Sequence, residues 1–437
     1  MIVHFHGGLV SKATAMKAIN SHLLTTYNTN YSRPIFFIWE SGIFDVLKNN
    51  LDDIFSEKIF KILLKKVTKV LSAKFNKETT EKGLRSTNDG MYNNEFSKIS
   101  IDEYPFDQLD NISDSIELLN PAEENLIEQN LLRDLELLRE ISSISSSISE
   151  VPVKKGIKMQ GSAKTLMNHE YLATDEKGQK GIISTAKVAL SVIQILQKVI
   201  ARLKNHTHHG VYATIIEELL REFYVGNIGK FVWDEMKNYI KESFNDDPEL
   251  YGGTAFLTEL KERWKDGYKP EITLVGHSAG SYAIGYLLKA ADKMELPPEI
   301  KFNLILLAPA CSFIFLNDII NNHESRINKL RCFGMKDAVE KKDKMLSIIY
   351  PHSLLYFVSG LLEDEVDKPL VGMERYYTRN TTDVQAVKAY FNQTQNSNIW
   401  SIAGNLDGLS SSSFKHGDFD NDDITLKSIM HIVEKGY

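Results

Sequence analysis

Six short segments of the chain are rich in apolar residues and are bounded by polar or turn-forming residues. Their apolar positions run almost continuously, which is typical of strands buried on both faces of a parallel sheet. Helical patterns separate the last four segments, so the chain predicts a doubly wound, mostly parallel α/β core of about six strands. The predicted strands comprise residues 2–5, 35–39, 272–275, 304–307, 330–335 and 399–402.

A long stretch between the second and third predicted strands has a different pattern, with helical segments alternating with polar tracts. Asn120 and Pro121 predict a helix start, because Asn caps a first turn and Pro fits the first helical position. The serine-rich residues 142–150 predict a linker that ends this helix. We therefore expect a core formed by residues 1–42 and 250–437 and a large helical insertion, residues 43–249, that acts as a cap or lid.

One helix of the insertion has an apolar stripe and a separate row of lysines, Lys61, Lys65 and Lys69. A basic amphipathic helix can lie on a membrane surface. The simpler interpretation, which we favour, is a lid helix with its apolar side on the core and its lysines in water. The apolar stripe comprises Phe60, Leu63, Leu64, Val67 and Leu71.

Composition places the chain among ordinary globular proteins. It has 437 residues, of which 43% are hydrophobic, and a formal net charge of -7. The mild acidity argues against a nucleic-acid partner, which usually requires a basic field. Only Cys311 and Cys332 are present, so a disulfide framework is not expected and a reducing compartment fits. No targeting segment and no apolar run of ~20 residues is visible, so we expect a soluble cytoplasmic protein.

The sharpest chemical signal is the sequence ITLVGHSAG, residues 272–280. A serine is a weak nucleophile unless it is exposed on a strained turn beside a base. A sharp turn from strand to helix brings neighbouring backbone segments close together, so flanking positions such as Gly276 and Gly280 must lack side chains. The following helix points its positive end at Ser278, which favours developing negative charge.

The motif Gly276-His277-Ser278-Ala279-Gly280, between a strand and a helix, resembles the nucleophile elbow of the α/β-hydrolase superfamily. The resemblance implies Ser278 as nucleophile and the amide of Ala279 as one oxyanion-hole donor. It also implies the order nucleophile, acid, histidine, which His416 satisfies as the base. Asp337, just past a predicted strand, is the favoured acid. If residues 354–358 form the strand instead, Asp364 or Asp367 takes that role.

The beginning of the chain, IVHFHGGL, matches the superfamily's second oxyanion loop. Gly7 and Gly8 would present backbone amides to the substrate oxygen. The chain departs from the superfamily pattern because no antiparallel strands precede residue 2, so we expect a sheet trimmed to six strands.

Two groups of histidines raise the question of a metal. His4 and His6 share one strand face, and His206, His208 and His209 form a second cluster. Neither group comes with further ligands at a recognisable spacing. We therefore expect no metal and no cofactor, with His6 packed beneath the oxyanion loop and residues 206–209 in a solvated turn.

Together, the expected elbow, base and oxyanion donors predict a function. We expect a serine hydrolase, of carboxylesterase or lipase type, that cleaves an ester bond of a small molecule or lipid through an acyl-serine intermediate. The alternatives are a thioesterase or peptidase with the same triad, and a non-catalytic scaffold whose insertion binds a protein partner. Peripheral membrane contact is compatible with this function, and a nucleic-acid partner is not expected.

Overall fold

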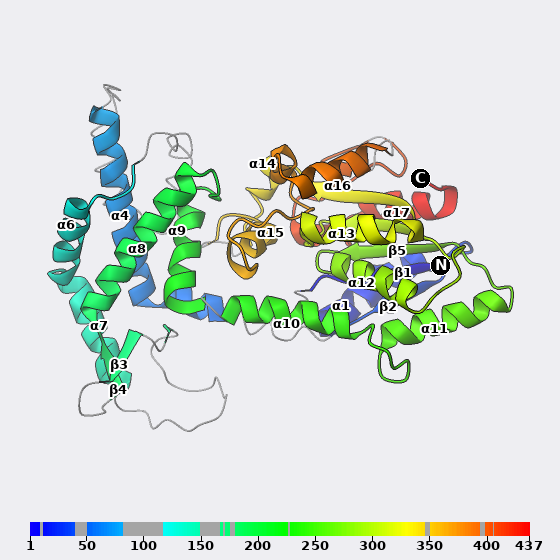
Figure 1. Ribbon diagram of the computed structural model, residues 1–437, viewed down its shortest axis with the longest axis horizontal. Helices are drawn as coiled ribbons and strands as arrows, with labels where there is room; N and C mark the ends of the chain where they lie inside the picture. Colours follow the sequence, from blue (N-terminus) through cyan, green and yellow to red (C-terminus); the bar gives the residue numbers. More distant parts are fainter. Residues whose placement is uncertain are drawn as a thin grey trace. The chain divides into compact units, whose positions relative to one another are not determined.

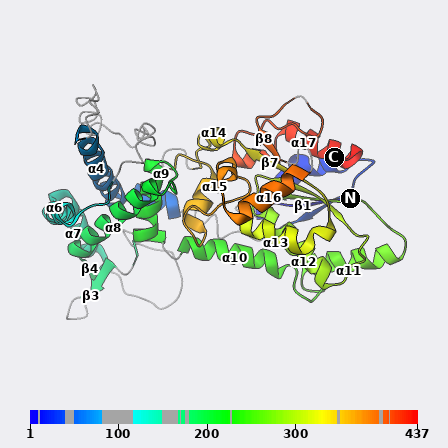
Figure 2. The same cartoon turned by 45° about the horizontal axis from the view of Figure 1, so that its top comes forward.

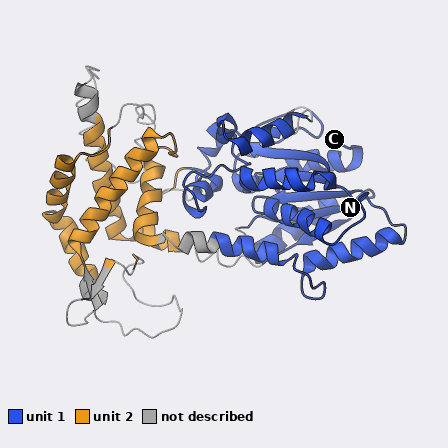
Figure 3. Ribbon diagram, in the orientation of Figure 1, with its two compact units in different colours: residues 1–46, 231–345, 352–437 blue, residues 47–230, 346–351 orange. Residues whose placement is uncertain are grey.

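The structure is a computed structural model. It describes residues 1–8, 12–39, 50–81, 117–148, 167–168, 171–174, 180–225, 228–345, 350–393, 398–404 and 406–437. The chain divides into two compact units (Figures 1 and 3). Unit 1 comprises residues 1–46, 231–345 and 352–437, and unit 2 comprises residues 47–230 and 346–351.

Unit 1 is built on a six-stranded sheet in which every neighbouring pair of strands is parallel. The strand order is β2-β1-β5-β6-β7-β8. The α/β class and the six strands predicted from the apolar segments are therefore confirmed. The strands are β1 (Ile2–Phe5), β2 (Pro34–Phe37), β5 (Ile272–His277), β6 (Phe302–Leu307), β7 (Ile327–Met335) and β8 (Asn398–Ser401).

Helices flank this sheet. The helices α12 (Gly280–Lys293), α13 (Phe313–His323) and α16 (Thr382–Gln393) pack side by side (Figure 2), with α11 (Gly252–Lys265) next to α12. The helix α17 (Asp423–Lys435) contacts α2 (Leu24–Tyr27), which follows α1 (Lys12–Ala18) and a π-helical turn, Ile19–Leu23. The connection from β1 to β2 runs across the sheet in the opposite direction to those from β5 to β8. Right-handed crossovers therefore place its helices on the other face.

The reversal of strand order lies between β1 and β5. From β1 the chain continues to β2 on one side, whereas from β5 it continues to β6 on the other. In open α/β sheets, ligands bind outside the carboxyl ends of the strands at such a switch point. Residues 6–8 follow β1 and Ser278 follows β5, so both predicted site segments lie at this position.

Seven further elements of the described chain belong wholly or partly to unit 1. They are α10 (Ile228–Glu242, which begins in unit 2), α14 (Asp337–Glu340), α15 (Leu354–Phe357), a π-helical turn Val358–Leu362, and 3-10 turns at Glu324–Arg326, Glu374–Thr378 and His416–Asp418. Residues 354–358 are thus helical, and β7 occupies the region where the strand preceding Asp337 was expected.

Unit 2 is mainly helical. The helices α4 (Lys58–Glu81), α7 (Leu135–Ile148), α8 (Thr185–Lys204) and α9 (Val211–Leu220) pack around one core, with α6 (Pro121–Leu132) on α8. The strands β3 (Leu172–Thr174) and β4 (Lys180–Ile183) form an antiparallel pair. The predicted apolar stripe of α4 is buried: Phe60, Leu63, Leu64, Val67 and Leu71 are at most 6% exposed.

The helix predicted to begin at Pro121 starts as expected with α6, but the helical segment that follows it, α7, extends further than expected. The Asn120 side chain accepts hydrogen bonds from the amides of residues 122 and 123, and the Glu123 carboxylate accepts one from the Asn120 amide. The serine-rich tract, predicted to be a linker, instead continues the helix α7 through residue 148. The prediction was wrong because Ile141 and Ile144 recur at a helical spacing within the serines, and both are buried.

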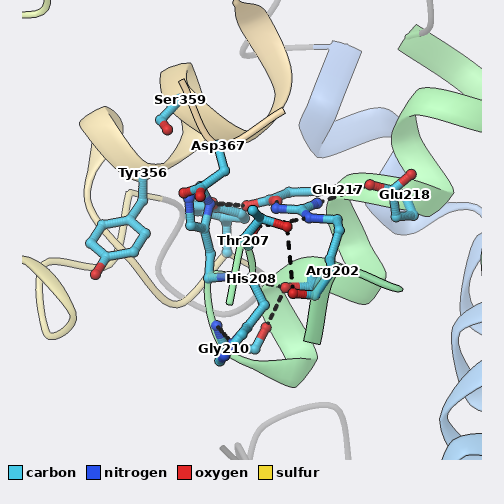
Figure 4. A network of polar contacts seen from close by, with 12 residues as sticks. Arg202, Thr207, His208, Gly210, Glu217, Glu218, Tyr356, Ser359 and Asp367 are labelled. Atoms are coloured by element: carbon cyan, nitrogen blue, oxygen red, sulfur yellow. Dashed lines mark hydrogen bonds and ion pairs between the residues drawn. The ribbon is translucent and has the colours of Figure 1, made fainter. Parts of the chain in front are cut away.

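A buried ion cluster joins α8 to α9. The Arg202 guanidinium donates to Glu217 at 2.6 Å and to Glu218 at 2.9 Å (Figure 4). Glu217 also accepts from Tyr350 and from Nδ1 of His209 at 2.8 Å. His209 is fully buried, so the expectation of a solvated turn at residues 206–209 was wrong for this residue. The carboxylate of Glu217 supplies the partner that makes its burial possible.

No helix in the described part of the chain is long and apolar enough to cross a membrane.

Candidate functional site

Ser278 occupies a strained turn between β5 and α12. Its φ angle is 52°, in the left-handed region that residues with a side chain rarely adopt. The surrounding backbone holds this conformation: the Ser278 amide donates to the carbonyl of Leu307 at 2.8 Å. The Ser278 carbonyl accepts from the amide of Ala310 at 3.0 Å and from the Ser281 hydroxyl at 2.6 Å. The turn is therefore tied to the end of β6 and to the first turn of α12.

The two glycines that flank the serine are required by close packing. A β-carbon on Gly276 would lie 2.8 Å from the backbone of Gly280. A β-carbon on Gly280 would lie 2.4 Å from the backbone oxygen of Phe5, at the end of β1. Any side chain at either position would push α12 away from the sheet. The motif thus has the close approach of strand and helix that was inferred from its spacing.

The two predicted oxyanion segments lie next to each other. A β-carbon on Gly8 would come within 2.6 Å of the Ala279 β-carbon and 2.0 Å of the Met236 sulfur. Met236 belongs to α10 and therefore covers both segments. Ala279 is the N-cap residue of α12, where the helix dipole favours negative charge.

His416 lies in the turn before α17 and is 6% exposed. Its amide donates to the Asp343 carboxylate at 2.7 Å, and its carbonyl accepts from Nε2 of His277 at 2.9 Å. Both ring nitrogens are buried and have no hydrogen-bond partner among the residues that the structure describes. Burial, and then the charge of His277, lower the pKa of His416 to about 3, so its ring is neutral. A neutral imidazole has one unprotonated nitrogen that can accept a proton, and the lowered pKa makes it a weaker base than an exposed histidine.

The structure brings His416 to the elbow, but no carboxylate in the described part of the chain hydrogen-bonds to its ring. Asp337 instead accepts a hydrogen bond from Tyr356 and pairs with Lys341 at 3.0 Å. Burial raises the pKa of Asp337, but these two contacts outweigh it and the pKa falls below the usual value. Asp364 pairs with Lys368, and Asp367 pairs with Arg375, Arg379 and Tyr376. None of the three predicted acids hydrogen-bonds to His416.

The structure brings another carboxylate, Asp420, to the elbow, and sequence reasoning did not single it out. Asp420 contacts Nδ1 of His277 at 3.2 Å, and the rings of His277 and His416 are 5.2 Å apart. Burial raises the pKa of Asp420, but the charge and hydrogen bond of His277 outweigh it and lower the pKa to about 2. The sequence did contain a signal for Asp420 as a candidate acid, because this residue lies in the same loop as His416, only four residues further along the chain.

Two more histidines lie beneath the site on β1 and its loop. His6 accepts from the Trp39 amide at Nε2 and therefore donates from Nδ1 to the carbonyl of Gly7, at 2.6 Å. Its ring also stacks on Trp39. His4 is buried between Tyr27 and Phe36, and burial lowers its pKa to about 3. Both histidines are therefore neutral, and His6 supports the loop through its hydrogen bond to Gly7.

The site is closed to solvent. Ser278 is 2% exposed and Ala279 is fully buried. The helix α10 is held over them by Trp233, whose Nε1 donates to the buried Glu363 at 2.6 Å. The hydroxyl of Tyr282, on α12, also donates to Glu363 at 3.3 Å. A substrate can reach Ser278 only after α10 or its neighbours move. Among the described residues, no group of three His, Cys, Asp or Glu side chains could hold a metal ion.

The chain is similar to the arginine–tRNA ligase of Helicobacter pylori (strain G27), with 26% identity over 200 residues. The match covers 42% of this chain and 33% of the ligase, so the chain spans about a third of that relative's length. No family model matches the chain. No solved structure matches it.

This similarity overturns part of the sequence analysis. The expected ester hydrolysis by a carboxylesterase, lipase, thioesterase or peptidase is wrong, because the relative is named for joining arginine to tRNA. The alternative of a non-catalytic scaffold whose insertion binds a protein partner stays a prediction. The expectation of an ester substrate without a nucleic-acid partner is also wrong. Its basis was a net charge of -7, and net charge does not report how basic residues are distributed on a surface.

Proposed function

We propose that this protein is an enzyme that acts on tRNA. The similarity to the arginine–tRNA ligase supports this proposal and is the observation that carries it. Because the match covers only a third of the ligase, tRNA binding and the ligation reaction are separate proposals with separate tests.

Unit 2 has a row of exposed lysines on the helix α4, and we propose this row as the surface that binds tRNA. Lys61, Lys65 and Lys69 are exposed on α4 at intervals of four residues. Successive lysines in such a row are ~6 Å apart along the helix axis. The apolar side of α4 is buried in its own unit, which leaves this row for an external partner. Lysine ammonium groups attract phosphates and release the bound counterions, which is the main source of affinity for nucleic acids.

Titration of the full chain with tRNA tests the proposal. We expect binding whose logarithmic association constant falls linearly with the logarithm of the salt concentration. Duplex DNA of matched charge serves as the competitor. Absence of binding at low salt, or equal binding to DNA, would exclude tRNA as the specific partner. Incorporation of labelled arginine into tRNA in the presence of ATP tests the ligase reaction separately.

We also propose that unit 1 has an α/β-hydrolase-like core in which Ser278 is the nucleophile and His416 the base. The strained turn at Ser278 and the free, neutral ring of His416 support these roles. The amides of Gly7, Gly8 and Ala279 are proposed as donors to developing negative charge. The roles of Asp337, Asp364 or Asp367 as the acid, and of residues 43–249 as a cap, stay predictions.

A small fluorophosphonate reagent tests the nucleophile. We expect it to label Ser278, and we expect labelling to disappear in Ser278→Ala and to persist in Ser56→Ala, where an exposed serine of unit 2 is removed. Labelling that survives in Ser278→Ala would place the reactive group elsewhere. This test concerns the roles of the residues and does not imply ester hydrolysis.

A further inference from the structure

His277 contacts two hydrogen-bond acceptors through its two ring nitrogens. Nε2 lies 2.9 Å from the carbonyl oxygen of His416, and Nδ1 lies 3.2 Å from a carboxylate oxygen of Asp420. The His277 side chain is 5% exposed and that of Asp420 is 14% exposed. Water therefore competes little for either contact.

These contacts determine where the protons are. A backbone carbonyl can only accept a hydrogen bond, so Nε2 of His277 carries a proton. An ionised carboxylate can only accept as well, and the pKa of Asp420 is about 2. Nδ1 therefore carries a second proton. A histidine with both nitrogens protonated is a cation, unlike neutral His6, whose Nε2 accepts from a backbone amide.

The groups around His277 agree with this charge. Burial lowers its pKa, but the charge and hydrogen bond of Asp420 outweigh burial and the net change is upward. The other titratable groups that face it are His416 from the loop and His4 and His6 from the β1 side. Burial lowers the pKa of each of these three histidines. The cation at His277 therefore faces one carboxylate and three neutral imidazoles.

We propose that His277 is an imidazolium held by Asp420, and that this pair positions His416 and keeps the His416 ring uncharged. The Nε2–H group of His277 anchors the His416 backbone to the elbow, while Nδ1–H anchors the same loop four residues later through Asp420. The positive charge beside His416 disfavours a second positive charge on its ring. His277 and Asp420 are thus positioning residues. Their role rests on the proposed function of His416 as the base.

Nitrogen-15 NMR of the labelled full chain tests the charge without reference to activity. The His277 signals are assigned by their loss in His277→Gln. We expect both ring nitrogens to be protonated, with a titration midpoint above the ordinary value of ~6.5. In Asp420→Asn the midpoint should fall by about one pH unit or more, because the countercharge is lost. The control Asp407→Asn removes an exposed carboxylate of the preceding loop and should leave the midpoint unchanged. A wild-type midpoint at or below 6.5 would overturn the proposal.

The rate of Ser278 labelling as a function of pH tests the effect on His416. In His277→Gln the new amide side chain keeps one donor for the His416 carbonyl but carries no charge. We therefore expect the acid limb of the profile to move up by about one pH unit in this variant. A raised NMR midpoint with an unmoved acid limb would refute the influence on His416. If Ser278 is not labelled at all, the proposed function fails, while the NMR result still decides the charge of His277.

Discussion

Gly280, in the first turn of α12, lies directly against the backbone of Phe5 at the end of β1. A β-carbon at this glycine would come within 2.4 Å of the Phe5 carbonyl oxygen. This contact packs α12, which follows β5, against β1, the neighbouring strand at which the sheet order reverses. It places Ser278 beside the loop that follows β1. The backbone of Phe5 cannot move without disturbing β1, so the position has no room for a side chain.

We therefore expect Gly280→Ala to lower the free energy of unfolding by about 2–3 kcal/mol, which is typical of overpacking in a buried position. The control is Gly417→Ala, because a β-carbon there meets no atom within 4 Å. Urea unfolding of both variants provides the measurement. Equal stabilities would show that α12 shifts freely to accept the methyl group.

Met236 covers Gly8 and Ala279, so its removal should open the site. In Met236→Ala we expect Ser278 to react faster with the fluorophosphonate, because the sulfur no longer blocks the approach to the elbow. Met373→Ala is the matched control: Met373 is a buried methionine of the same unit, and its loss costs a similar ~2–5 kcal/mol of stability. If both variants accelerate labelling equally, the cause is general loosening and not access past Met236.

Two buried neutral histidines should make unit 1 sensitive to acid. His4 and His416 have pKa values of about 3 in the folded protein, whereas an unfolded histidine has ~6.5. Between pH 6 and pH 4 the unfolded chain binds one more proton at each residue. The free energy of unfolding therefore falls as the pH falls, by ~1.4 kcal/mol per pH unit for each histidine.

Replacing one of these residues should reduce the slope. In His4→Phe we expect the dependence of stability on pH to weaken by ~1.4 kcal/mol per pH unit, whatever the change in stability at neutral pH. His431→Phe alters a half-exposed histidine of α17 and serves as the control. Denaturant titrations at several pH values give the slopes. An unchanged slope in His4→Phe would mean that His4 is charged in the folded state.

The lysine row of α4 should govern binding of tRNA. We expect the triple variant Lys61→Glu, Lys65→Glu, Lys69→Glu to bind tRNA more weakly, with a salt dependence reduced by about one unit for each lost phosphate contact. The control changes three exposed lysines of unit 1, Lys336, Lys427 and Lys435, to Glu. Because both triple variants carry the same net charge, equal losses of affinity would argue against a specific role for α4.

The ion cluster of unit 2 should be essential for stability. Glu217→Ala leaves the buried guanidinium of Arg202 without its partner at 2.6 Å, and we expect a loss of about 3–5 kcal/mol. Glu136→Ala, which removes a half-exposed carboxylate of the same unit, should cost under ~1 kcal/mol. Thermal unfolding of both variants gives the comparison. A small effect of Glu217→Ala would mean that water or Glu218 compensates the charge.

Local patterns predicted the framework of the protein well. The six apolar segments form the six strands of the sheet, and Asn120 and Pro121 mark a helix start with a reciprocal cap. The prediction of a serine-rich linker failed because two isoleucines in this tract recur at a helical spacing. They form one apolar face of α7. It failed again at His209, whose burial depends on Glu217 from the next helix.

The amino-acid sequence by itself determined the parallel α/β core and the strained elbow at Ser278, because both depend on interactions between residues close together in the chain. Only the tertiary structure decided which charges surround His416. Asp337 contacts Tyr356 and Lys341. In contrast, Asp420 and His277, which are 143 residues apart, contact each other at the elbow. Such pairings depend on how separate loops pack at the sheet edge, because a carboxylate forms hydrogen bonds with the donors that tertiary packing places near it.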